Sequence, residues 1–305
     1  MRSYLFIIAA LPVLASCEKE VQVDLPKHQS ALVLNSYTET DGLIQLQVGK
    51  SLSIKEYNYR SDLTVTNATV QLYKDGQLAE TMQYDAGEQQ YLSAQKAIDG
   101  STYEVKVSAP GFTRVEATSI VPSKVPIEGE VLRTQYAKTD AYGTRLDELR
   151  IRFTDPPGAG DHYILKFYDA RSQDTTAGFY YYADICLTSP DASVETAYND
   201  DIDQNTCLSS NGIFMKDELF NGTTKDLRLY LAHDALDTVM LNGLVLRPYI
   251  ELYHVPEAYY RYIKTYQYAQ NNNGNPFSEP INVFSSVKNG YGIFSITSLD
   301  SKQIK

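Results

Sequence analysis

The sequence contains no tryptophan and only four histidines among its 305 residues. The histidines, His28, His162, His233 and His254, are far apart, and none belongs to a His-Glu-x-x-His or His-x-His pattern that would indicate a zinc site. The chain also lacks the Gly-x-Ser-x-Gly turn of many hydrolases and the Gly-rich, Lys-containing loop that binds phosphates. We therefore expect no catalytic residue, no metal site and no cofactor. A carboxylate pair for glycoside hydrolysis stays open, because its members can come from any part of a chain.

Long apolar segments and positive charge are also scarce. Beyond the N-terminal segment, no stretch approaches the roughly 18 apolar residues that indicate a transmembrane helix, so we expect the rest of the chain to lie outside the bilayer. There are 27 Lys and Arg against 38 Asp and Glu, which gives a formal net charge of −11. Such a chain lacks the cations that bind nucleic acid or an anionic lipid surface, so we expect no nucleic-acid partner.

The N-terminus is typical of an exported lipoprotein. Arg2 is the only charge before Cys17, and an apolar segment of about a dozen residues, too short to span a bilayer, lies between them. Leu14-Ala15-Ser16-Cys17 is similar to a lipobox, in which the cysteine sulfur receives the lipid. We expect a signal peptide at residues 1–16, acyl chains such as palmitate on Cys17, and a tether at residues 17–27, since two or more chains give stable anchoring. The alternative is an ordinary signal peptide with an unrelated cysteine.

Only two other cysteines are present, Cys186 and Cys207. In an exported protein they can persist as a disulfide, and closing a loop of about 20 residues would stabilise the fold by about 3 kcal/mol. Two thiols without paired histidines make a poor metal site. We therefore expect a structural disulfide between them.

Residues 28–122 read as short strands separated by turns. Ile44, Leu46 and Val48 alternate with polar residues, and Asp75-Gly76 is a hairpin turn between two such runs. Regular runs of this length predict a small antiparallel, immunoglobulin-like sandwich. Two prolines, Pro122 and Pro126, then indicate a stiff connector and a domain boundary.

Residues 123–305 predict a larger, Tyr-rich β domain with one helix. Expected strands are 149–153, 163–168, 179–187, 227–231, 244–253, 281–284 and 292–296. A helix is expected at about 256–270, because Pro256 begins a segment in which Tyr259, Tyr262, Ile263 and Tyr266 fall at helical spacing. The fold class is therefore mainly β.

Tyrosine is abundant, with 25 residues, and suits both strand packing and contact with ligands or proteins. The cluster at residues 179–182 fits either use, and we favour packing. Asp201, Asp203 and Asn205 alternate as in a calcium loop, but Thr206 and Gly212 stand where that loop needs glycine and a bidentate carboxylate. We expect a solvated acidic loop there.

Four segments in fixed order resemble one family along residues 17–297. They are Cys17–Pro26, Arg152–Gly158 with His162-Tyr163, Gly212–Phe214 with Asp217–Gly222, and a final set of Tyr260–Tyr262, Gly274–Pro280 and Asn289–Phe294. Together they are similar to the lipoprotein family called domain of unknown function 4249. Its members come from a Gram-negative group that takes up glycans at the cell surface, and they are often encoded beside TonB-dependent receptors.

The resemblance implies an outer-membrane lipoprotein, lipid-anchored and surface-exposed, with a TonB-dependent receptor as partner and an unknown nutrient as ligand. Glu18-Lys19-Glu20 is similar to the surface-export tag of that group, although retention on the inner leaflet stays open. We expect a binding or transport accessory. The alternatives are a structural or adhesive surface protein and, with less support, a surface hydrolase.

Overall fold

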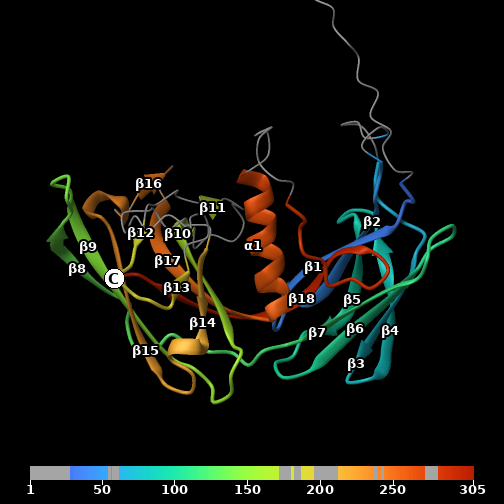
Figure 1. The fold of residues 1–305 in the computed structure, drawn as a ribbon, viewed down its shortest axis with the longest axis horizontal. Coiled ribbons are helices and arrows are strands. Elements are labelled where there is room, and N and C mark those ends of the chain that lie inside the picture. The colour runs from blue at the N-terminus through green and yellow to red at the C-terminus, as the bar shows by residue number, and fades with distance from the viewer. Residues whose placement is uncertain are drawn as a thin grey trace, which may run out of the picture.

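The computed structural model describes residues 28–53, 56, 62–171, 180–181, 187–195, 212–236, 239–241, 244–271 and 281–305. Over these residues the chain is mainly β, with one α-helix near the C-terminus, which confirms the predicted fold class. Two β lobes lie side by side and the helix stands between them (Figure 1). Within the described ranges, no helix is long and apolar enough to span a membrane.

The first lobe consists of short strands with alternating burial. In β1 (Leu32–Glu39) and β6 (Thr102–Ser108) every second residue is buried, as expected for strands with one face on a core. Asp75 and Gly76 have φ of 49° and 80° and form the predicted hairpin turn. The other strands of this lobe are β2 (Leu43–Lys50), β3 (Thr69–Lys74), β4 (Gln77–Asp85), β5 (Gln90–Lys96) and β7 (Val115–Ile120).

These strands form a sheet that curls back on itself. The order is β18-β1-β2-β5-β4-β3-β6-β7, where β18 (Tyr291–Gln303) is the last strand of the chain. The two ends of the order meet, because Glu116 bridges to Lys288 and the Ile296 amide donates to Ser119 Oγ at 3.0 Å. The pairs are antiparallel as predicted, except that β1 and β18 run parallel.

The second lobe is a sandwich of two sheets. One sheet has the order β13-β14-β10-β17-β18, and the other β12-β15-β9-β8. Phe153, Leu165, Leu229 and Leu252 belong to the core between them. Its strands are β8 (Leu132–Thr139), β9 (Arg145–Thr154), β10 (His162–Arg171), β11 (Tyr180–Tyr181), β12 (Leu187–Thr188), β13 (Val194–Glu195), β14 (Ile213–Lys216), β15 (Thr224–Ala232), β16 (Val239–Leu241) and β17 (Leu244–Val255), with 3-10 turns η1 (Asp217–Leu219) and η2 (His233–Leu236).

The single α-helix, α1 (Glu257–Asn271), covers the outer face of the first of these sheets. It begins after Pro256, whose carbonyl accepts from the amides of Tyr259 and Tyr260, within one residue of the predicted start. Tyr259 and Tyr260 are buried against Ile164 and Tyr253 of the sheet. Because both faces of β10 and β17 are covered, consecutive residues of both strands are buried, at 162–165 and 250–255.

Strand β18 belongs to both lobes. Residues 291–297 pair with β1, whereas residues 298–303 pair with β17, so one continuous sheet crosses the molecule. A Cβ atom at Gly292 would lie 2.0 Å from the Leu34 carbonyl oxygen, so only glycine permits the close approach of β1 and β18 there. Phe294 and Ile296 complete the core of the first lobe. That core therefore includes residues from beyond the expected boundary at residue 122.

One predicted strand is wrong. Residues 281–284 form no strand, because the Phe284 amide donates to Thr265 Oγ1 of α1 at 2.8 Å and not to a neighbouring strand. The predicted strand at residues 179–187 lies largely outside the described residues, apart from β11 and the start of β12.

Candidate functional site

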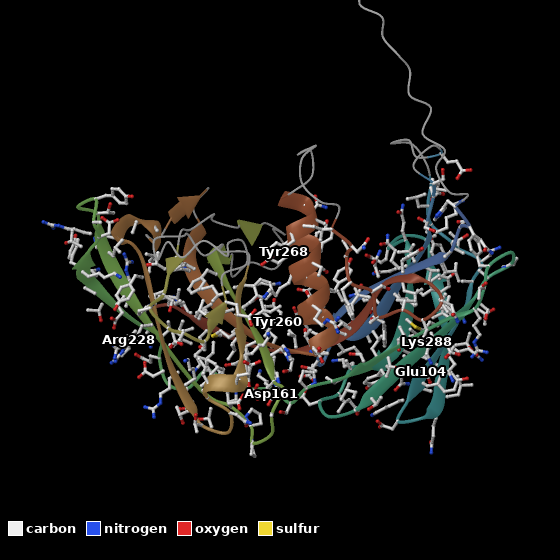
Figure 2. All side chains as sticks on the ribbon, in the orientation of Figure 1. Glu104, Asp161, Arg228, Tyr260, Tyr268 and Lys288 are labelled. Carbon is white, nitrogen blue, oxygen red and sulfur yellow. The ribbon has the colours of Figure 1, made fainter. Side chains whose placement is uncertain are left out.

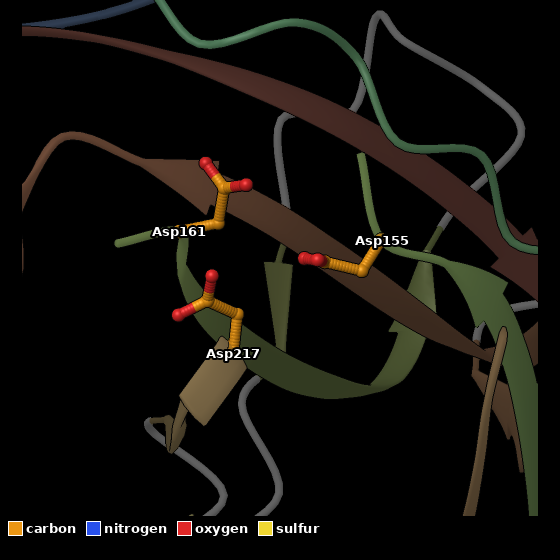
Figure 3. Close-up of side chains that lie close together, drawn as sticks. All are labelled: Asp155, Asp161 and Asp217. Atoms are coloured by element: carbon orange, nitrogen blue, oxygen red, sulfur yellow. The ribbon is translucent and has the colours of Figure 1, made fainter. Parts of the chain in front are cut away.

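Three aspartates meet at one end of the second lobe. Asp155 follows β9, Asp161 precedes β10 and Asp217 begins η1 after β14. Their side chains lie close together (Figure 3), and one carboxylate oxygen from each lies within 4.8 Å of the others. The antiparallel pairing of β10 with β14 brings these strand ends together. Asp161 lies at the lower edge of this lobe in Figure 2.

Asp155 is the most enclosed of the three, at 1% exposure. Tyr163 donates its hydroxyl to Oδ1 at 2.5 Å, and the Gly222 amide donates to Oδ2 at 2.8 Å. Burial raises the pKa of Asp155, these two donors lower it, and the charges of Asp161 and Asp217 raise it again, so that the pKa lies above its usual value. Burial and the bond to Asp155 also raise the pKa of the Tyr163 hydroxyl.

The other two aspartates link neighbouring segments. Asp217 binds the loop before β10, and Asp161 contacts His254 of β17, which in turn contacts the connector between the lobes. Asp217 Oδ2 accepts from the Gly160 amide at 2.9 Å. Asp161 Oδ1 lies 2.9 Å from His254 Nε2, while His254 Nδ1 lies 2.8 Å from the Ser123 carbonyl oxygen. Because a carbonyl oxygen only accepts, Nδ1 is the donor in the contact with Ser123.

The cluster has some features of a site for a hard cation. Such ions take carboxylate oxygens, and calcium ligands lie at about 2.3–2.6 Å from the metal. Both oxygens of Asp155, however, already accept from protein donors. Among the carboxylate oxygens of this cluster, Asp161 Oδ2 and Asp217 Oδ1 receive no hydrogen bond from the described residues. The hydrogen bonds of the cluster therefore hold two loops together. Asp161 Oδ2 and Asp217 Oδ1 are the two oxygens that a cation would bind.

A second buried aspartate lies in the same lobe. Asp147 is fully buried and accepts from Arg133 Nε at 2.5 Å, from the Tyr136 amide at 2.8 Å and from His233 Nδ1 at 2.9 Å. Burial alone would raise the pKa of Asp147, but these three donors outweigh it and hold the pKa below its usual value. The His233 ring packs against the Tyr136 ring, with centroids 4.0 Å apart and planes tilted by 30°.

The four histidines have separate partners. His28 pairs with Ser51, His233 with Asp147, and His254 with Asp161. His162 is buried against Tyr260, with ring centroids 4.8 Å apart. Within the described ranges, no two histidines share a metal-type cluster.

Most residues singled out in the sequence fall outside the described part of the chain. These are Cys17, Cys186, Cys207, the acidic loop at 200–205 and the segment at 274–280. The lipidation of Cys17 and the disulfide between Cys186 and Cys207 therefore stay predictions.

Sequence reasoning missed the aspartate cluster, although two of the four family-like segments form it. The Asp155-Pro-Pro-Gly158 turn contacts the Asp217–Gly222 turn, because Gly158 donates its amide to Asn221 at 3.2 Å and Gly222 donates to Asp155. The signal available in the sequence was an aspartate next to the end of several expected strands. Which of these aspartates meet depends on how distant strands pair.

Comparison with known proteins shows which family the chain belongs to. A family model described as "Domain of unknown function (DUF4249)" matches residues 18–303. The chain belongs to this family. Its description names no catalytic activity. No curated protein matches the chain.

One solved structure is similar at a low level: the crystal structure of a protein from Corynebacterium diphtheriae that is described as membrane anchored. It is 8% identical, the alignment covers 75% of this chain and 55% of that one, and the TM-score is 0.20.

Proposed function

We propose that this member of the DUF4249 family is anchored to the outer membrane through acyl chains on Cys17, faces the cell surface, and serves as a binding or transport accessory to a TonB-dependent receptor. The receptor class comes from the resemblance of the sequence segments described above. The position of the folded body relative to Cys17 carries the proposal.

The described fold begins close to the expected anchor. The first described residue is His28, eleven positions after Cys17, and β1 begins at Leu32. Even a fully extended tether of this length spans only about 36–40 Å. A lipid on Cys17 therefore holds His28, where the first lobe begins, within about 40 Å of the membrane surface and of an integral membrane protein there. A much longer tether would not restrict the body in this way.

The surface of the body has residues suited to protein or ligand contact. Five of the large exposed apolar side chains in the described part are tyrosines, between 43% and 84% exposed: Tyr37, Tyr136, Tyr142, Tyr266 and Tyr291. Tyrosine combines an apolar ring with a hydroxyl and is enriched at protein interfaces. This exposure supports a contact role, and it leaves the partner to be identified by experiment.

The test is affinity isolation of the tagged protein from gently solubilised outer membranes, followed by mass spectrometry. A TonB-dependent receptor in stoichiometric amount is the expected result, and the cargo of that receptor then names the ligand class. The control is Cys17→Ala, which should not co-isolate the receptor from membranes. A clean preparation without a receptor, from cells that express one, would overturn the transport role in favour of a structural or adhesive protein.

A further inference from the structure

The hairpin between β8 and β9 extends beyond the rest of its sheet. The last residue pair between β15 and β9 is Ala232 with Leu146, so the two strands of the hairpin continue past the end of β15. Every residue from 134 to 145 is exposed except Asp140, which is half-buried. In Figure 1 the hairpin forms the outer corner of the second lobe. We call residues 138–145 the hairpin tip.

One aromatic ring stands out at the hairpin tip. Tyr142 is 84% exposed, more than any other large apolar side chain in the described part of the chain. Its backbone is held in place, because Asp140 Oδ1 accepts from the amides of Thr144 and Tyr142 at 2.8 and 2.9 Å. The bond from Thr144, together with that from Tyr142, holds the pKa of Asp140 below its usual value. The hairpin turns of the first lobe consist instead of small and polar residues, at 41–42, 75–76 and 86–89.

The charge of the hairpin tip differs from that of the whole chain. Lys138 and Arg145 are exposed, and each lies over a neighbouring tyrosine ring, 3.7 and 5.2 Å from its centre, a contact that leaves the cation charged. The only acid between them is Asp140, whose carboxylate already accepts from two amides. The tip thus has two cations against one carboxylate, whereas the chain has a net charge of −11. A ring flanked by cations is typical of a membrane–water interface, where rings sit at the level of the headgroups and cations reach lipid phosphates.

The hairpin tip and the start of the fold lie on the same side of the molecule. In Figure 1 the hairpin, in green, and the N-terminal end of β1, in blue, both reach the upper edge. The opposite side is marked by η1, because Gly222, just after η1, donates to Asp155 at the far end of β9. The ten residues of β9 separate these two ends by about 33 Å. A membrane on the side of the tether therefore faces the hairpin tip and not η1.

We propose that the hairpin tip is a second membrane contact, in which Tyr142 enters the headgroup layer of the bilayer that holds Cys17, with Lys138 and Arg145 beside lipid phosphates. This inference names a lipid surface as a partner of the folded body and rests on the anchor proposed above. The acyl chains supply the attraction, so the acidic chain needs no overall positive charge, and the tip determines which side of the body meets the bilayer. A protein partner is less favoured, because a stable interface buries about 800 Å² on each partner, whereas the tip presents one ring and two cations.

The test uses the absence of tryptophan from the chain. Tyr142→Trp places a single tryptophan at the hairpin tip, and the matched control, Leu219→Trp, places one in η1, where Leu219 is 66% exposed. Each acylated variant is reconstituted in vesicles of phosphatidylcholine and phosphatidylglycerol, with and without brominated acyl chains, which quench tryptophan on contact. Emission from Tyr142→Trp should shift to the blue and be quenched, while emission from Leu219→Trp stays unchanged.

Two further changes test the parts of this contact. Adding Lys138→Glu to Tyr142→Trp should weaken the quenching, because it places a carboxylate beside anionic lipid. Adding Cys17→Ala should abolish the quenching, because the tip does not hold the body to the membrane without acyl chains. Quenching that survives Cys17→Ala would keep the lipid contact and overturn its dependence on the anchor.

The remaining outcomes separate this inference from the anchor. Equal quenching of the two tryptophan variants overturns this inference alone, and so does an acylated, vesicle-bound Tyr142→Trp protein that is not quenched. A chain that carries no acyl group overturns the anchor and this inference together. A protein partner at the tip would give blue-shifted but unquenched emission in membranes that contain the co-isolated receptor, and this outcome also overturns the lipid contact.

Discussion

Asparagine in place of Asp147 removes a charge from the interior of the second lobe and leaves the side-chain size unchanged. In the native protein this carboxylate accepts three hydrogen bonds, two of them from the side chains of Arg133 and His233. The Arg133 side chain is only 13% exposed. The variant therefore removes the negative charge that faces a largely buried guanidinium.

The expected loss follows from these contacts. Breaking a buried ion pair by removing one partner costs about 3–5 kcal/mol. The amide oxygen of the introduced asparagine still accepts from one or two of the three donors, so we expect Asp147→Asn to lower the free energy of unfolding by about 3 kcal/mol at pH 7. The control is Asp226→Asn, because the side chain of Asp226 is 51% exposed and lies 3.7 Å from Arg150. That change should cost at most about 1 kcal/mol.

The effect also has a direction in pH. The pKa of Asp147 is lower in the folded protein than its usual value. Such a group contributes stability above the pKa of the unfolded chain, about 3.9, and this contribution is lost as the pH falls through the folded pKa. The stability difference between the parent and Asp147→Asn should therefore be full at pH 7 and 5 and should shrink below pH 4.

Urea unfolding followed by circular dichroism at pH 7, 5, 4 and 3 measures this difference. A loss below 1 kcal/mol at pH 7 would refute the reasoning. So would a difference between the two proteins that stays constant down to pH 3, because the stabilisation would then not come from the ionised carboxylate.

Three further predictions concern other parts of the chain. Cys17→Ala should release the protein from the membrane fraction into the periplasm in unacylated form, and its presence in washed membranes would contradict the lipid anchor. Intact mass under non-reducing conditions should be 2 Da below the reduced mass, and reduction should cost about 3 kcal/mol of stability if Cys186 and Cys207 form a disulfide; two free thiols after labelling of the denatured protein would disprove the pairing. Tyr163→Phe should lower the free energy of unfolding by about 1–3 kcal/mol, because it leaves buried Asp155 with one donor fewer; a loss below about 0.5 kcal/mol would mean that the hydroxyl does not stabilise the cluster.

The local features of this fold could be predicted from the sequence. Pro256 and the tyrosines at helical spacing predicted α1 to within one residue at each end, and Asp75-Gly76 predicted its hairpin. These features depend on neighbouring residues, whose effect on backbone conformation is direct. The prediction failed at residues 281–284, where alternating apolar residues satisfy their backbone through the helix and not through a sheet.

The long-range features could not be predicted. Nothing local in Phe294-Ser-Ile296 shows that this segment completes a core built mainly from residues 32–121. The meeting of Asp155, Asp161 and Asp217 likewise depends on which strands pair, because alternating patterns fix the face of a strand and leave its neighbour open.

The double use of β18 has a consequence for the order of events in the cell. Ribosomes and export channels deliver a chain from its N-terminus, and domains usually fold as units in that order. Here the first lobe lacks Phe294 and Ile296 until β18 has been made, long after its other strands. Its curled sheet therefore stays unclosed until β18 has been made. Strand β18 sets the moment at which both lobes become native.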